Sequence, residues 1–192
     1  MPLAIPDSSG KTGWLGGIYA QDEWKILPRV TLNFGARFDM ISAFTHESQL
    51  SPRVNVVWQP TDATTFHAGY SRYFTPPPFE LVSPTAIALL ANTTAAPEIT
   101  QNDAAKAERA HYFDIGATQI VLPGLKVGLD SYYKIAKNLI DEGQFGAPII
   151  LTPFNYERGY AAGADLTTSY DVENWSFYGN FAVAQAEGKK IV

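Results

Sequence analysis

The stretch Val30-Thr31-Leu32-Asn33-Phe34-Gly35-Ala36-Arg37-Phe38-Asp39-Met40 decides the fold. Its apolar side chains occupy every second position, and small, polar or charged residues fill the positions between them. Successive side chains of a β-strand point to opposite faces, so this stretch predicts a strand with one apolar face and one polar face.

The same alternation recurs along the rest of the chain. Each further segment places apolar residues on one face and mostly small, polar or charged residues on the other. These segments are 14–24, 53–58, 66–71, 113–118, 125–135, 162–170 and 175–183. Together with the first stretch they predict eight strands, mostly of the roughly ten residues that a tilted strand needs to cross a bilayer.

The predicted connections between these strands alternate between short and long. The tight links are expected at 27–28, 59–63, 122–124 and 171–174. The long loops are expected at 41–51, 74–107 and 139–154. Outer-membrane barrels place short turns on the periplasmic rim and long loops on the other rim. Trp24, Trp58 and Trp175 all lie beside tight links, as an aromatic girdle at one membrane interface requires.

The composition excludes several other classes of protein. No stretch approaches the roughly 20 consecutive apolar residues of a membrane-spanning helix. Fifteen Gly, thirteen Pro and ten Tyr favour strands and turns. The chain has no Cys, which excludes disulfides and thiolate metal sites. A net charge of −5 argues against nucleic acid as a partner, because phosphates require clustered Lys and Arg.

The predicted fold class is therefore all-β, an antiparallel up-and-down transmembrane β-barrel of about eight strands, either closed as a small barrel or part of a larger one. We expect an N-terminal extension at 1–13, a barrel segment of four hairpins at 14–188 and a C-terminal tail at 189–192. The alternative is a soluble or surface-exposed β-sandwich that acts as a binding or adhesion module and packs its apolar faces inward. Strands longer than about five or six residues favour the membrane barrel.

Several segments resemble motifs of TonB-dependent outer-membrane receptors. The segment Tyr19-Ala20-Gln21-Asp22-Glu23-Trp24, with Leu32 to Asp39 after it, resembles the family's YxQDxWxL…LxxGxRxD hairpin. Leu50-Ser51-Pro52-Arg53 resembles its LSPR motif, and residues 67–77 resemble its xAxYxRxFxxPP segment. Residues 155–166 are similar to a further strand of the family, with Asp165 where Glu is common. The matches follow one another in order and span nearly the whole chain.

The resemblance implies a barrel of about 22 strands in the bacterial outer membrane, closed by an N-terminal plug. It also implies nutrient uptake, of a siderophore-like ligand, with energy from the TonB complex. The implied partners are outer-membrane lipid, the barrel-assembly machinery, a small-molecule ligand that the sequence does not identify, and TonB through a plug outside this chain. No plug precedes Trp14, and Lys189-Lys190-Ile191-Val192 is not an aromatic-ended last strand. We therefore expect an internal segment of such a barrel, or a short product derived from one.

Charged residues on the polar faces are the first group of candidate functional residues. They form either a lattice of charges that solvate and pair with one another or a polar wall along a substrate path. The candidates for the lumen-facing positions are Arg37, Asp39, Arg53, Asp130 and Asp165.

The long loops supply the second group. Loops as long as 74–107 are usually functional or disordered, so this loop is the best candidate for contact with an extracellular ligand. An unordered surface loop, with its aromatic residues marking the outer interface, is the alternative. The candidate ligand-contacting residues are Tyr73, Pro77, Phe79, Phe145 and Tyr156.

The three histidines do not support a metal or catalytic site. His46, His67 and His111 form no HxH or HxxxH pair. An outer-membrane hydrolase, the second alternative, would pair His67 with Ser71 or His111 with Asp114. The chain has no GxSxG motif, and strand alternation places His111 and Asp114 on opposite faces. We predict no enzymatic activity, no catalytic residue, no metal and no cofactor.

Overall fold

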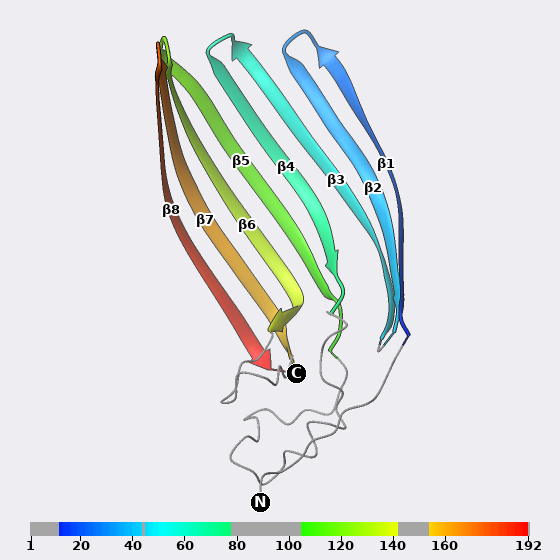
Figure 1. Ribbon diagram of the computed structural model, residues 1–192. Helices are drawn as coiled ribbons and strands as arrows, with labels where there is room; N and C mark the ends of the chain where they lie inside the picture. Colours follow the sequence, from blue (N-terminus) through cyan, green and yellow to red (C-terminus); the bar gives the residue numbers. More distant parts are fainter. Residues whose placement is uncertain (1–11, 44, 78–104, 142–153, 192) are drawn as a thin grey trace, which may run out of the picture.

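The computed structural model describes residues 12–43, 45–77, 105–141 and 154–191. Within these ranges eight β-strands form one antiparallel sheet in which the strand order equals the chain order (Figure 1). The strands are β1 (Trp14–Leu27), β2 (Val30–Ser42), β3 (His46–Thr61), β4 (Thr64–Thr75), β5 (Glu108–Leu122), β6 (Leu125–Asp141), β7 (Phe154–Val172) and β8 (Trp175–Ile191). The predicted all-β, up-and-down architecture of eight strands is confirmed.

The sheet is a curved wall with two open edges. β1 pairs only with β2, and β8 pairs only with β7. No pairing joins β1 to β8 in the described ranges, so the eight strands form an open sheet and not a closed small barrel.

Four tight turns lie at one end of the sheet, the upper end in Figure 1, and join β1 to β2, β3 to β4, β5 to β6 and β7 to β8. These two-residue turns are 28–29, 62–63, 123–124 and 173–174. Backbone hydrogen bonds connect a turn to the neighbouring strand, and the Asp171 amide near the end of β7 donates to the Gly124 carbonyl at 2.9 Å. The tight links predicted from sequence are therefore present, at the end of the sheet away from Trp14 and Ile191.

The prediction of a long loop at 41–51 is wrong. β2 continues to Ser42 and β3 begins at His46, and Ile41 pairs with Glu47 across the hairpin. Beyond the membrane both faces of a strand meet water or protein, so the alternation that marks a strand fades while the hydrogen-bond ladder continues. The strands at the next two connections end and begin within two residues of the expected loop limits, and 78–104 and 142–153 lie outside the described residues.

The strand register gives the sheet one apolar face and one polar face. One continuous row of paired residues crosses five strands on the apolar, outward face: Phe34, Val54, Tyr70, Phe113 and Tyr133. The adjacent row, one residue along each strand, lies on the opposite face: Gly35, Arg53, Ser71, Tyr112 and Lys134. The alternation read from the sequence is therefore realised in three dimensions across neighbouring strands.

The outward face remains uncovered in the described part of the chain. Ile18, Ile115 and Phe181 are 72%, 65% and 67% exposed. The buried apolar side chains of the described residues are few and mostly small: Ile41, Ala43, Ala107, Ala110, Ala136 and Phe154. A soluble sandwich would cover its apolar face with a second sheet, whereas the described strands form one sheet. Lipid is the environment that suits this face.

Three of the four tryptophans, Trp24, Trp58 and Trp175, lie in a band next to the tight turns. Trp24 packs edge-on against Phe34 at 4.7 Å between ring centroids, and Trp58 stacks on Phe66 at 5.5 Å. The Trp24 indole N–H also donates to the Asp22 carboxylate at 2.8 Å. An apolar ring with a satisfied polar N–H suits the boundary between hydrocarbon and water. Within the described ranges no helix has the length and apolar character to cross a bilayer.

Gly124 is the one glycine of the described residues that adopts a positive φ, at 85°. A Cβ at this position would also clash with the backbone carbonyl oxygen of Asp171 in β7. We expect Gly124→Ala to lower the free energy of unfolding by about 1–2 kcal/mol, because the left-handed backbone and the clash both penalise a side chain.

Urea titration of the protein refolded in detergent, followed by tryptophan fluorescence, measures this loss. Gly16→Ala is the matched control, because a Cβ there meets only the Met40 Cγ atom at an ordinary 3.7 Å. Equal stability of the two variants would contradict the assigned strain.

Candidate functional site

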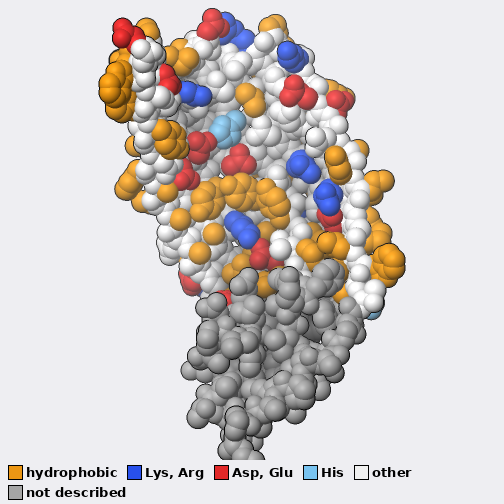
Figure 2. All heavy atoms as spheres, viewed as in Figure 1, with side chains coloured by type: hydrophobic (Ala, Val, Ile, Leu, Met, Phe, Trp, Pro, Cys, Tyr) orange, Lys and Arg blue, Asp and Glu red, His pale blue; other side chains and the backbone are white. Residues whose placement is uncertain are grey.

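The face opposite the apolar rows is hollowed and carries most of the charge. Figure 2 shows Lys, Arg, Asp and Glu side chains spread over this concave face, with a band of apolar side chains across its middle and others projecting at its margins. Arg53 belongs to the polar row described above, and Asp130 pairs directly with Asp165. Arg37 and Asp39 extend the same face of β2. All the residues predicted to face a lumen thus share one face, and their part in ligand passage remains a prediction.

Several of these charges are paired along the wall. The Arg37 Nε atom donates to the Asp39 carboxylate at 2.6 Å. The Lys134 ammonium lies 2.5 Å from the Glu108 carboxylate, and Glu108 is buried. These pairs agree with a lattice of mutually compensating lumen charges.

His67 lies between carboxylates near the middle of the concave face. Its Nε2 atom is 3.1 Å from Asp130 and 3.8 Å from Asp114. Gly69 and Gly116 provide the room, because a Cβ at either position would clash with one of these carboxylates. No group of three or more His, Asp or Glu in the described residues has the arrangement needed to hold a metal ion.

Neither proposed hydrolase pairing is assembled in the structure. The His111 Nδ1 atom is 2.9 Å from the Tyr70 hydroxyl on the outward face, whereas Asp114 lies on the concave face and contacts His67. His67 interacts with the two carboxylates, and Ser71 lies four residues further along β4, about 13 Å away at the rise of a strand.

The predicted ligand-contacting residues are separated in space. Tyr73 lies at the end of β4 on the wall of a cavity, and Pro77 follows that strand and is buried. Tyr156 lies on β7, where its ring packs edge-on against Phe154 at 5.2 Å. Phe79 and Phe145 lie outside the described residues. Of the described candidates, only Tyr73 joins the lumen-facing residues in one cavity.

A fork between β3 and β4 creates that cavity. The β3–β4 ladder ends at the pair Arg53–Ser71, while β3 remains paired with β2 through residue 46. Pro52 follows directly on the β3 side, and its missing N–H offers no donor to extend the ladder. The two strands therefore separate towards the end of the sheet that is opposite the tight turns, as Figure 1 shows.

Side chains replace the backbone ladder beyond the fork. The Gln49 amide Nε2 donates to the Tyr73 carbonyl at 2.9 Å and to the Ser51 hydroxyl at 3.0 Å. The Glu47 carboxylate accepts from the Ala107 amide at 2.7 Å and from Arg109 at 2.9 Å. The Gln49–Tyr73 bond thus joins β3 to β4, and the Glu47 bonds join β3 to the start of β5.

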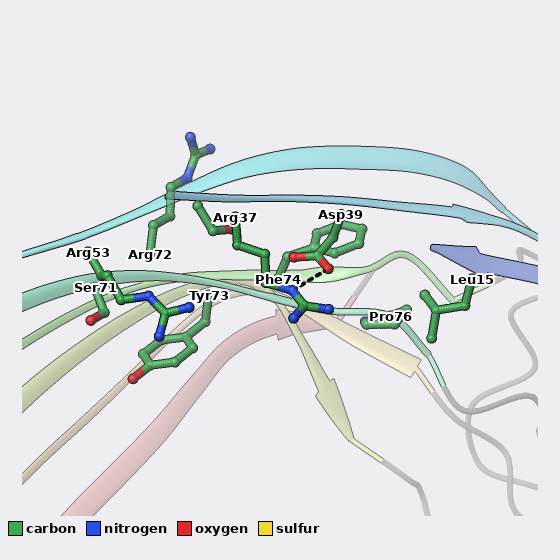
Figure 3. Close-up of a pocket in the computed structure, with 10 residues that line it drawn as sticks. Leu15, Arg37, Asp39, Arg53, Ser71, Arg72, Tyr73, Phe74 and Pro76 are labelled. Atoms are coloured by element: carbon green, nitrogen blue, oxygen red, sulfur yellow. Dashed lines mark hydrogen bonds and ion pairs between the residues drawn. The ribbon is translucent and has the colours of Figure 1, made fainter. Parts of the chain in front are cut away.

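The cavity at the fork has a volume of about 370 Å³ (Figure 3). Its lining includes Arg37, Arg53, Ser71, Tyr73 and Pro76. A second cavity of about 540 Å³ continues along the concave face and shares Arg53 and Ser71 with the first. Arg53 thus stands where the two cavities meet.

Sequence reasoning selected Arg37, Asp39, Arg53 and Tyr73 but missed Ser71 and Leu15 as neighbours in this cavity. In the sequence Ser71 stands out only as a possible hydrolase residue, and Leu15 carries no signal that separates it from the other apolar residues of segment 14–24. Pro52, which directly precedes the strand predicted at 53–58, was the available signal, because a proline has no N–H to donate and marks a place where a ladder ends.

A family model supplies the identification. The model described as TonB dependent receptor-like, beta-barrel, matches residues 3–190. The chain belongs to this family. The resemblance noted in the sequence motifs is thereby confirmed, and the TonB-dependent receptor barrel is a protein of the bacterial outer membrane.

Solved structures of similar fold include three receptors and transporters. The FrpB iron transporter from Neisseria meningitidis (F5-1 variant) has a TM-score of 0.69 and 19% identity, covering 94% of this chain and 27% of its own. The siderophore receptor PirA from Pseudomonas aeruginosa has a TM-score of 0.71 and 19% identity, covering 92% and 35%. The copper transporter OprC has a TM-score of 0.67 and 18% identity, covering 91% and 29%.

At these identities the likeness shows the receptor-barrel fold alone. The chain spans about a quarter to a third of the length of those solved proteins. No curated protein matches it significantly. In this TonB-dependent receptor barrel the tight turns take the periplasmic side, and the fork and its cavity open towards the other rim.

Proposed function

We propose that the chain forms part of the barrel wall of an outer-membrane receptor that binds a small nutrient complex and imports it with TonB energy. The observation that carries the proposal is the family match over residues 3–190, on a sheet whose concave face is charged and whose outward face is apolar. A wall of this kind separates a polar interior from lipid.

The similar solved proteins suggest which nutrients to test first. Their descriptions name an iron transporter, a siderophore receptor and a copper transporter. We infer that a metal ion or a metal complex is the cargo of the receptor to which this wall belongs. TonB would act through a plug domain, and outer-membrane lipid and the barrel-assembly machinery would be further partners.

We infer that the wall binds and guides its ligand and performs no catalysis. The surroundings of two histidines support this inference. His67 lies against Asp130 and Asp114, and His111 lies against Tyr70. Neither histidine is therefore arranged to activate Ser71. The similar solved proteins are described as transporters and receptors.

Uptake by cells that express the receptor containing this wall tests the proposal. We expect accumulation of radioactive iron or copper to require TonB, because an energised plug must move before cargo passes the barrel. Binding of the same cargo to chilled cells should persist without TonB. Accumulation at equal rates with and without TonB would instead indicate a passive pore and would overturn the proposal.

A further inference from the structure

Arg53 is a cation without a partner at the base of the fork cavity. Its guanidinium makes no hydrogen bond or ion pair within the described residues. The acidic residue of the cavity lining, Asp39, is already bound by Arg37 at 2.6 Å. Arg37 is therefore paired, whereas Arg53 has no direct partner among the described residues although Asp22, Glu23 and Asp114 line the second cavity that it borders. Its guanidinium is thus available to an anion in the fork cavity.

The surroundings of Arg53 add a hydroxyl group and an apolar wall. Arg53 and Ser71 form the last pair of the β3–β4 ladder, so their side chains are cross-strand neighbours on the concave face. Figure 3 shows the side chains of Arg53, Ser71 and Tyr73 on the same side of the sheet, with Pro76 further along. Leu15 completes the apolar part of the lining.

Arg72 does not contribute a second cation to this group. It is among the residues at the cavity, but in Figure 3 its side chain points to the opposite side from that of Arg53. One unpaired guanidinium matches one planar carboxylate through two parallel hydrogen bonds. A doubly charged phosphate would need a further free cation, which Arg37 does not provide because Asp39 holds it.

We propose that the fork between β3 and β4 binds the carboxylate of a small organic ligand, with Arg53 and Ser71 on the carboxylate and Tyr73, Pro76 and Leu15 on its apolar part. The cavity of about 370 Å³ accommodates a group of the size of benzoate. The inference rests on the proposed function because it names the chemical class of ligand for the same wall.

Binding to the purified protein in zwitterionic detergent tests the site, with benzoate as the probe and titration calorimetry or saturation-transfer NMR as the measurement. Benzoate is expected to bind, and its neutral isostere benzamide is expected not to bind. Arg53→Gln should weaken benzoate binding roughly tenfold or more, because a charge-assisted bidentate contact is lost. Lys126→Gln, which removes a positive charge elsewhere on the concave face, is the control and should leave binding unchanged.

A second variant keeps the test decisive if Arg53→Gln does not fold. Tyr73→Ala should weaken benzoate several-fold and leave acetate unaffected, because acetate lacks the apolar part that Tyr73 contacts. Equal binding of benzoate and benzamide, an unaffected Arg53→Gln variant, or competition by inorganic phosphate as strong as that of benzoate would each overturn the site. TonB-dependent uptake without benzoate binding would contradict the proposed carboxylate site and leave the proposed function standing. Benzoate binding with TonB-independent uptake would contradict the proposed function and leave the carboxylate site standing.

Discussion

Val54→Arg is expected to cost about 2–4 kcal/mol of the free energy of folding into a bilayer, the penalty for a cation on the lipid face near the midplane. Val54 lies on the outward row between Phe34 and Tyr70, and it is 39% exposed although strands flank it on both sides. The exposed part of the side chain therefore faces lipid. Urea titration of the protein in phosphatidylcholine vesicles, followed by tryptophan fluorescence, measures the loss.

Asn55→Arg is the matched control for this prediction. Asn55 is the next residue of β3, at nearly the same depth, and it lines a cavity on the concave face. A cation there meets a polar interior, so the stability should change little. If Asn55→Arg proved the more damaging substitution, the apolar face would pack against protein and the membrane assignment would fail.

Asn155→Ala should lower the free energy of unfolding by about 3 kcal/mol, because three hydrogen bonds are lost at roughly 1 kcal/mol each. The buried Asn155 amide donates to the carbonyls of Lys106 and Asn138 at 3.0 and 2.9 Å. Its carbonyl accepts from the Lys106 amide at 2.8 Å. One side chain thus joins the start of β5, the end of β6 and the start of β7.

Asn180→Ala is the corresponding control. Asn180 is exposed on β8, and its side chain makes no hydrogen bond among the described residues. Thermal unfolding in detergent should separate the two variants, with Asn155→Ala melting clearly earlier. Identical melting curves would show that the long-loop end of the sheet does not depend on this residue.

The fold could be predicted because membrane strands carry a local signal. A strand between lipid and a polar interior alternates strictly, as residues 30–40 do, and tight turns punctuate the alternation. Eight strands and their two faces follow from that pattern without any knowledge of partners. The motif Leu50-Ser51-Pro52-Arg53 then indicated the family, which the family model confirms.

The strand bounds and the fork at the end of the sheet opposite the tight turns were harder to predict from the sequence, for a physical reason. Residues 41–51 read as a loop because polar side chains are tolerated on both faces of a strand once it leaves the hydrocarbon. The fork depends on pairing between β3 and β4, a relation that no single segment of sequence reveals. The lack of a direct partner for Arg53 depends in turn on the local pairing of Arg37 with Asp39.

The length of β7 has a further consequence for how the receptor stands in its membrane. Its 19 residues, at about 3.3 Å each and a tilt of roughly 40°, rise about 48 Å, whereas the apolar band of such barrels is about 25 Å tall. Nearly half of the strand therefore extends beyond the acyl chains, at the level of the sugar layer of the outer leaflet.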